Sequence, residues 1–318
     1  METCSSRPSL GQPLKRALRH IAAAWLLTAI LGLFPCFAGA TPATLIVVPV
    51  GPQNENSITL IYPENQKKLG KNVHQWLLRE FTDLAALLGK PNGMKLQVQL
   101  TESERFYRET GMPRWTNAIY YNSQIIIPIK NSLVGEDSQL VRAVRHELVH
   151  AITDFLTGGR CPGWLDEGLA QYLEGDEHPA LRSALERWVK ESGPISFTAL
   201  QSGFTKLNRK MVPAAYAQSF YSVNQLFHRG SESSFQKFFS ALGAGGEESD
   251  VFENAFGVSI ETFTSEIYAQ LNSWKIGKNA HGKMLATYRL VRTNGDSAST
   301  PAEKASLRQT KVKYTEAR

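Results

Sequence analysis

The sequence predicts an α+β fold, in which a small mixed β-sheet with accompanying helices is followed by a mainly helical half. Short segments rich in β-branched residues occur between positions 44 and 127, whereas apolar residues recur at helical spacing after position 178. An apolar period of two indicates a half-buried strand, and a period of three to four indicates an amphipathic helix. We therefore expect the sheet to come from the first half of the chain and helices to make up the second.

Five segments of the first half are expected to form strands. Residues 44–50 and 58–62 are rich in β-branched residues, and residues 94–100 alternate apolar with polar side chains, as half-buried strands do. Residues 118–121 and 124–127 flank an Asn-Ser dipeptide, which predicts a pair of strands around it.

Two long helices are expected in the same half. Apolar residues take helical steps through residues 64–88, and Gly89 and Pro91 end that run. The same rhythm continues through residues 139–156, until Thr157-Gly158-Gly159 stops it. Both segments are therefore predicted to be amphipathic helices.

Helical periodicity recurs in four segments of the second half, at residues 179–191, 213–229, 232–242 and 259–274. Glycine and proline breakers separate several of these segments. From residue 293 onward the chain loses nearly all aromatic residues and gains Ser, Thr, Lys and Glu, so this end is expected to be a mobile tail.

The first 40 residues have the pattern of a signal peptide. A basic leader precedes an apolar stretch at 21–37, and Ala38-Gly39-Ala40 places small residues where a signal peptidase inspects the chain. This predicts cleavage after Ala40 and export to the periplasm or the medium. An uncleaved membrane anchor is the alternative, but the apolar stretch is short and contains Pro35. A lipoprotein at Cys36 is disfavoured, because that signal requires small residues next to the cysteine.

Removal of the leader lowers the net charge. The full chain has 35 Lys and Arg against 29 Asp and Glu, and the leader takes four of the basic and one of the acidic residues, which leaves +3. That charge is too small to indicate nucleic acid or an anionic membrane as a partner. Cys161 is then the only cysteine, so no internal disulfide is expected. The mature chain is long enough for one large domain or two small lobes.

The motif that carries chemistry is His-Glu-Leu-Val-His at positions 146–150. Residues four apart lie on one face of a helix, so His146 and His150 can reach the same ion. Glu167 follows seventeen positions after the second histidine. A catalytic zinc ion takes three protein ligands and leaves a position for water, so these three residues would be the ligands and Glu147 the general base.

This pattern predicts a zinc-dependent peptidase that hydrolyses peptides or proteins with a metal-activated water, and other interpretations compete with it. An amphipathic helix whose two histidines are only solvated or packed is disfavoured, because the acidic motif around Glu167 follows at a distance suitable for a third ligand. A zinc-holding binding or scaffold protein with little turnover needs the same ligands, but it has no need of Glu147. An ion-independent structural or adhesive protein would hold no stoichiometric zinc. The sequence has no Gly-rich phosphate loop and no serine nucleophile elbow.

The stretch from His146 to Ala170 resembles the gluzincin metallopeptidases, in which a second helix brings a glutamate as third ligand. The run from Pro162 to Tyr172 is similar to bacterial peptidase MA-like proteins, and the resemblance covers about residues 45–275. It implies the same three zinc ligands and the same general base, and it says nothing of the substrate.

The resemblance also implies a zincin-like architecture. The upper lobe would span about residues 41–158 and the lower lobe about 159–275, with a C-terminal extension at 276–318 and the active cleft between the lobes. In the upper lobe an edge strand can pair with an extended substrate through main-chain hydrogen bonds. Ile125-Ile126-Ile127 is the candidate for that strand, and a buried core strand is the alternative.

Gluzincins supply a tyrosine or a histidine from the lower lobe to stabilise the transition state. By this resemblance Tyr216 is the first candidate, Tyr221 the second and His228 the third. Aromatic residues at helical spacing are usually part of the core, which is the alternative for each of them.

The partners that orient the ligands are left open. Asp154 and Asp166 are near enough in sequence to be candidates, whereas Gln171 stands where thermolysin-like enzymes have an aspartate. Cys161 lies between the two motifs, and as a thiolate it could block the metal. An ordinary loop residue is the favoured interpretation of this cysteine.

Overall fold

The computed structural model describes residues 43–129 except 52, 54 and 115, and then residues 137–175, 179–204 and 207–274. The described residues belong to one compact unit that begins at Ala43. The expected signal peptide, with Cys36, and the expected C-terminal extension at 276–318 lie outside the described residues. Within the described part of the chain, no helix is long and apolar enough to span a membrane.

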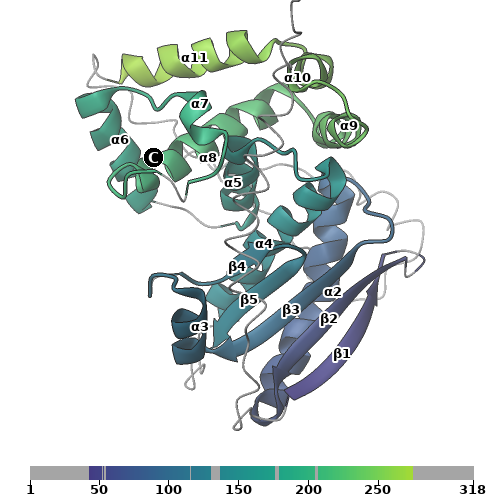
Figure 1. Ribbon diagram of the computed structural model, residues 1–318. Coiled ribbons are helices and arrows are strands. Elements are labelled where there is room, and N and C mark those ends of the chain that lie inside the picture. Colours follow the sequence, from purple (N-terminus) through teal and green to yellow (C-terminus); the bar gives the residue numbers. More distant parts are fainter. Residues whose placement is uncertain are drawn as a thin grey trace, which may run out of the picture. The chain divides into compact units, whose positions relative to one another are not determined.

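Five strands form a single mixed sheet in the order β1-β2-β3-β5-β4 (Figure 1). The outer pairs β1–β2 and β4–β5 are antiparallel, and the inner pairs β2–β3 and β3–β5 are parallel. This confirms the small mixed sheet expected from the first half. The strands are β1 (Ala43–Val50), β2 (Asn56–Pro63), β3 (Lys95–Glu102), β4 (Ile119–Tyr121) and β5 (Gln124–Ile129).

The strand order corrects the prediction for Ile125-Ile126-Ile127. These residues lie in β5, which pairs with β3 on one side and with β4 on the other, so β5 is an inner strand. Ile125 and Ile127 are almost completely buried. The alternative interpretation, a core strand, is therefore correct, and β4 is the edge strand on this side of the sheet.

One face of the sheet is covered by two long helices. Helix α2 (Lys67–Leu88) contacts β1 and β2, and α4 (Asp137–Thr157) contacts β4 and β5. Alternate residues of each inner strand are buried on this face, which is the period of two expected from the sequence. At Gly70 the helix comes so close to β2 that a Cβ atom would lie 2.6 Å from the Tyr62 ring.

The second half of the chain is helical, as predicted. Three short helices were not expected, because four to nine residues give too few turns for a clear period: α3 (Ser103–Thr110) in the first half, and α7 (Phe197–Leu200) and α10 (Glu248–Phe256) in the second. The other helical elements are η1 (Glu64–Gln66), α5 (Gly163–Leu173), α6 (Pro179–Ser192), α8 (Val212–Arg229), α9 (Glu232–Gly243) and α11 (Ile260–Ser273).

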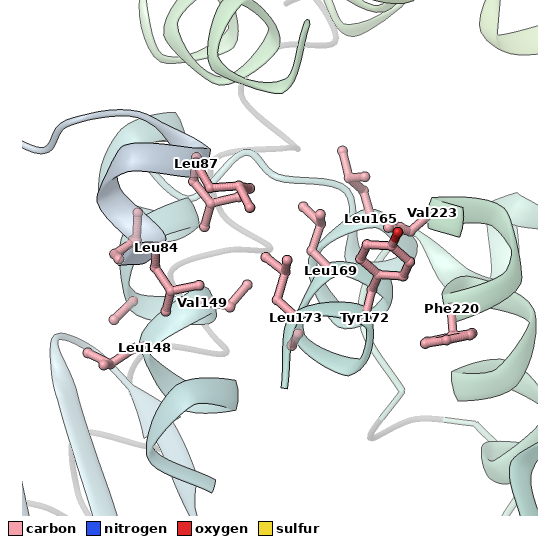
Figure 2. Packing of buried hydrophobic residues seen from close by; sticks show 14 of the residues in the cluster. Leu84, Leu87, Leu148, Val149, Leu165, Leu169, Tyr172, Leu173, Phe220 and Val223 are labelled. Atoms are coloured by element: carbon pink, nitrogen blue, oxygen red, sulfur yellow. The ribbon is translucent and has the colours of Figure 1, made fainter. Parts of the chain in front are cut away.

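Helix α5 is the central element of the core, because it packs against both α4 and α8. Gly168 lets α5 and α8 approach closely, since a Cβ atom there would lie only 2.5 Å from the Ser219 carbonyl oxygen. Figure 2 shows the buried apolar side chains that join these helices to α2: Leu84, Leu87, Leu148, Val149, Leu165, Leu169, Tyr172, Leu173, Phe220 and Val223.

Candidate metal centre

The two histidines and the distant glutamate converge. His146 and His150 lie one turn apart on α4, and their ring centroids are 4.9 Å apart. Glu167 lies on α5, and its Oε2 atom is 3.9 Å from His146 Nε2 and 3.7 Å from His150 Nε2. One ligand atom from each of the three residues lies within 4.8 Å of the others. The structure thus brings together all three residues that the sequence proposes as ligands.

This group of atoms fits a zinc ion. Two ligand atoms at ordinary zinc distances and a tetrahedral angle lie roughly 3.4 Å apart, close to the separations seen here. Glu167 Oε2 is buried and has no hydrogen-bond partner among the described residues. A buried carboxylate oxygen without a partner is costly, and a cation would supply the missing interaction. Two imidazole nitrogens with one carboxylate oxygen is also a donor set that zinc accepts.

The imidazole of His150 is oriented by Asp166. Its Nδ1 atom lies 2.7 Å from Asp166 Oδ2, and Thr153 Oγ1 donates a hydrogen bond of 2.5 Å to Asp166 Oδ1. Because Nδ1 is bonded in this way, Nε2 is the nitrogen that faces Glu167. Asp166 was one of the two candidates from the sequence, and it is the partner.

The imidazole of His146 is oriented by Glu174, which sequence reasoning missed. His146 Nδ1 lies 2.8 Å from Glu174 Oε2, and Arg142 Nη2 donates a hydrogen bond of 2.8 Å to Glu174 Oε1. Glu174 follows Glu167 by seven residues, or two helical turns, so a search for carboxylates on the same face of α5 would have found it. The carboxylate therefore comes from position 174 and not from Gln171.

Arg145 ties the metal-site helix to two other elements. Its guanidinium is buried, pairs with Glu80 of α2 and donates to the carbonyl oxygen of Leu173 at the end of α5. Glu80 is completely buried and also accepts hydrogen bonds from Arg79. These contacts fix α4 against α5 next to the candidate ligands.

The carboxylates around the two imidazoles favour a positive charge. Burial lowers the pKa of His150, but Asp166, followed by Glu167, raises it by more, to about 10. Burial also lowers the pKa of His146, but the hydrogen bond to Glu174 and the charges of Glu147 and Glu174 together raise it by more. Burial raises the pKa of Glu167 above its usual value. The electrostatic field of the protein groups alone is therefore suited to a cation.

The other two predicted site residues lie beside this group. Glu147 is mostly buried on α4, directly after His146. Tyr216 lies in the first turns of α8 with its ring edge-on to Phe204, at a centroid distance of 4.9 Å. Burial raises the pKa of Tyr216, and the charges of Glu167 and Glu147 raise it further, which indicates that its hydroxyl is near them.

The second and third candidates for the role of Tyr216 are placed elsewhere. The Tyr221 hydroxyl donates to Gln270 of α11 at 2.6 Å, and its ring packs on Trp274. His228 lies in the last turn of α8, about 18 Å along the helix from Tyr216. Neither residue joins the group around Glu167.

Cys161 does not join the candidate ligands either. Its thiol is free, and burial raises its pKa well above the usual value, so it stays protonated at neutral pH. A protonated thiol is a poor zinc ligand, because the thiolate is the ligating form. Its backbone N–H donates to Thr157 Oγ1 in the loop between α4 and α5. The structure favours the ordinary loop residue over the blocking cysteine.

A family model described as Peptidase MA superfamily matches residues 107–273, more than half of the chain. The chain therefore belongs to the Peptidase MA superfamily, which supports the gluzincin-type resemblance. The match covers both helices that carry the candidate ligands, and it confirms the resemblance seen in the sequence.

Among curated proteins no match was found. Among solved structures, the chain is similar to the M1 zinc metallopeptidase from Deinococcus radiodurans, with 16% identity, a TM-score of 0.42 and coverage of 74% of this chain and 52% of that one. It is also similar to native leukotriene A4 hydrolase from Saccharomyces cerevisiae, with 15% identity, a TM-score of 0.43 and coverage of 77% and 40%. The chain thus spans about half or less of the length of these structures.

Proposed function

We propose that this protein is an exported zinc-dependent peptidase that hydrolyses peptide bonds in peptides or proteins. The observation that supports this most is the convergence of His146, His150 and Glu167, with a buried carboxylate oxygen that no described residue satisfies. Membership of the Peptidase MA superfamily supports the peptidase class. These three residues are the proposed zinc ligands.

Zinc bound by these residues would supply Lewis-acid chemistry, which polarises the scissile carbonyl and makes a water molecule easier to deprotonate. Glu147 is the proposed general base: its carboxylate takes a proton from the attacking water and later passes it to the leaving nitrogen. Asp166 and Glu174 hold the imidazoles in the tautomer that directs Nε2 toward Glu167.

Tyr216 is the proposed donor for the transition state. Negative charge collects on the carbonyl oxygen as water attacks, and a positioned hydroxyl stabilises that charge by a hydrogen bond. The raised pKa of Tyr216 keeps its phenol protonated at neutral pH, so it can donate. Its position on α8, which packs on the Glu167 helix, supports this role.

Strand β4 is the proposed guide for the substrate. Among the described residues it pairs only with β5, so its other edge is available to an extended peptide. Main-chain hydrogen bonds along such an edge align a substrate without requiring particular side chains. Helix α4 contacts β4, so a peptide held there would lie next to the metal-site helix.

The peptidase proposal is tested with the wild type and Glu147→Gln, which removes the base and keeps the shape. Zinc content and hydrolysis of a mixed peptide library are measured for both proteins. We expect zinc in both and cleavage only in the wild type. Glu253→Gln, at an exposed position of α10, is the matched control that should cleave normally. Zinc without cleavage in the wild type would instead support the binding or scaffold interpretation.

Export is tested separately by expression in a bacterial host. The amino terminus of the recovered protein is sequenced after fractionation of the cells. A chain that begins at Thr41 in the periplasm or the medium is the expected result. A chain that keeps its leader in the membrane fraction would support the uncleaved anchor instead.

A further inference from the structure

A hydrogen bond joins the edge strand to the metal-site helix. The Tyr120 hydroxyl of β4 donates to Asp154 Oδ2 of α4 at 2.6 Å. The bond is partly buried, and the acceptor is a carboxylate, so it belongs to the stronger class of hydrogen bonds. Burial, followed by the bond to Asp154, raises the pKa of Tyr120, so the phenol stays protonated and keeps donating at neutral pH.

The strand register explains why this tyrosine reaches the helix. Tyr120 pairs with Ile125 of β5, which is buried on the face that the helices cover. Paired residues of antiparallel strands point to the same face, so Tyr120 points toward α4. Its neighbours Ile119 and Tyr121 point to the opposite face, and Tyr121 is half exposed. Tyr120 is therefore the residue of β4 placed to contact the helix.

The acceptor, Asp154, lies on the same helix as two of the candidate ligands. Asp154 follows His150 by four residues and His146 by eight, so the three side chains lie along one face of α4. Helix α4 ends at Thr157, three residues after Asp154, and the N–H of Gly159 donates to the Asp154 carbonyl oxygen at 2.9 Å. A Cβ atom at Gly159 would lie 3.3 Å from Asp154 Oδ1, so the carboxylate is closely surrounded.

The strand itself is short. β4 has three residues and among the described residues pairs only with β5. A strand of this length at the edge of a sheet makes few main-chain hydrogen bonds, so an additional bond to α4 restrains its position further. The Tyr120–Asp154 bond supplies that link at the middle residue of the strand.

We propose that Tyr120 and Asp154 are positioning residues, which set the place of the edge strand relative to the metal ligands and so align extended peptides for cleavage. This inference rests on the proposed peptidase function and on main-chain pairing of the substrate with β4. Neither residue touches the reacting atoms. A substrate long enough to lie along β4 needs the strand in place, whereas a substrate confined to the metal centre does not.

The kinetic test compares Tyr120→Phe with the wild type on two fluorogenic substrates, a tripeptide and an octapeptide. We expect KM for the octapeptide to rise about tenfold, the size of one lost charge-assisted hydrogen bond, while KM and kcat for the tripeptide change less than about twofold. Tyr268→Phe, whose hydroxyl accepts from Phe197 N far along the sequence, is the matched control and should change neither. Equal effects on both substrates, or none, would overturn the proposal.

Asp154 gives a second pair of variants. Asp154→Ala should reproduce the effect of Tyr120→Phe, and the double variant should add nothing further, because both changes remove the same bond. Asp154→Asn keeps an acceptor oxygen and should recover part of the lost affinity for the octapeptide. Additive effects in the double variant would contradict a shared role.

Hydrogen exchange of the full-length protein separates this inference from the peptidase proposal. Backbone amides of residues 116–124 should exchange about tenfold faster in Tyr120→Phe, with unchanged zinc content, because the strand opens more easily. Unchanged exchange would refute the positioning role even if the wild type is a peptidase. Faster exchange in Tyr120→Phe, together with a wild type that cleaves no peptide, would support the link between β4 and α4 and reject the proposed function alone.

Discussion

Replacing Gly168 by alanine should disturb the candidate metal centre indirectly, by pushing α5 away from α8. The new Cβ atom would lie 2.5 Å from the Ser219 carbonyl oxygen, and the Val223 side chain lies at 2.6 Å. An ordinary contact is about 3.4 Å, so the two backbones must separate by roughly 0.9 Å. Glu167 precedes Gly168 and Tyr216 lies one turn before Ser219, so the separation moves the proposed zinc ligand away from the proposed donor.

The magnitude follows from two opposing effects. Overpacking costs about 1–3 kcal/mol, and a 2.5 Å contact with backbone belongs to the upper part of that range, about 2–3 kcal/mol. Alanine in place of glycine in a helix returns about 1 kcal/mol, so we expect a net loss of about 1–2 kcal/mol. In a protein of this size that lowers Tm by roughly 2–8 °C. Misplacement of catalytic groups by about 1 Å costs on the order of 100-fold, so kcat should fall by about ten- to 100-fold.

The assay combines thermal unfolding with peptide hydrolysis at a temperature where both proteins are folded. Gly70→Ala is the matched control, because its Cβ would crowd the Tyr62 ring on the far side of α2, where no site residue lies among those described. That variant should lose a similar amount of stability and keep its kcat. A Gly168→Ala protein with wild-type Tm and kcat would refute the reasoning, since the close approach would then have room to relax.

Three further changes test the surroundings of the site. Glu174→Ala should weaken zinc affinity by about ten- to 100-fold, measured by competition with a chelator, because His146 loses the partner that orients it. Arg145→Ala should lower the free energy of unfolding by about 2–3 kcal/mol in urea titration, because buried Glu80 loses one of its two arginine partners and keeps Arg79. Tyr216→Phe should lower kcat by about tenfold or more while zinc content stays unchanged, and full turnover in that variant would remove Tyr216 from the mechanism.

Local patterns in the sequence predicted the long helices and the strands well. The helix expected at 64–88 is the 3-10 turn η1 followed by α2, and the expected strand pair around the Asn-Ser dipeptide is β4 with β5. Asn122 and Ser123 adopt positive φ angles of 49° and 60°, which a two-residue hairpin turn requires. Helices and tight turns of this kind depend on residues that are close together in the chain, so the sequence alone predicts them.

The strand order could not be predicted in the same way. A hairpin pattern shows that β4 and β5 pair, but it does not say which of them lies against β3. That choice depends on the burial of Ile125, Ile127 and Ile129 beneath the helices, which is a tertiary contact. The sequence therefore assigned the substrate-pairing role to β5, which lies one position inside the edge strand β4.

The candidate ligands could be predicted from the sequence, but only some of the residues that orient them or fix their helices could. The spacing of two histidines on one helix and one glutamate on the next contains most of the geometry of the site. The link between Arg145 and Glu80 joins positions 65 residues apart, and no local period indicates it. The partner of Asp154 comes from an edge strand 34 positions earlier, which is equally invisible from spacing.

The groups that would hold and orient the ion all come from one uninterrupted hairpin of two helices, which starts at Arg142 and finishes at Glu174. The hydroxyl proposed to act on the transition state comes from α8, a separate part of the polypeptide. Metal binding and peptide turnover would therefore depend on different segments of the chain. Substitutions in α8 should therefore reduce turnover before they reduce retention of the metal.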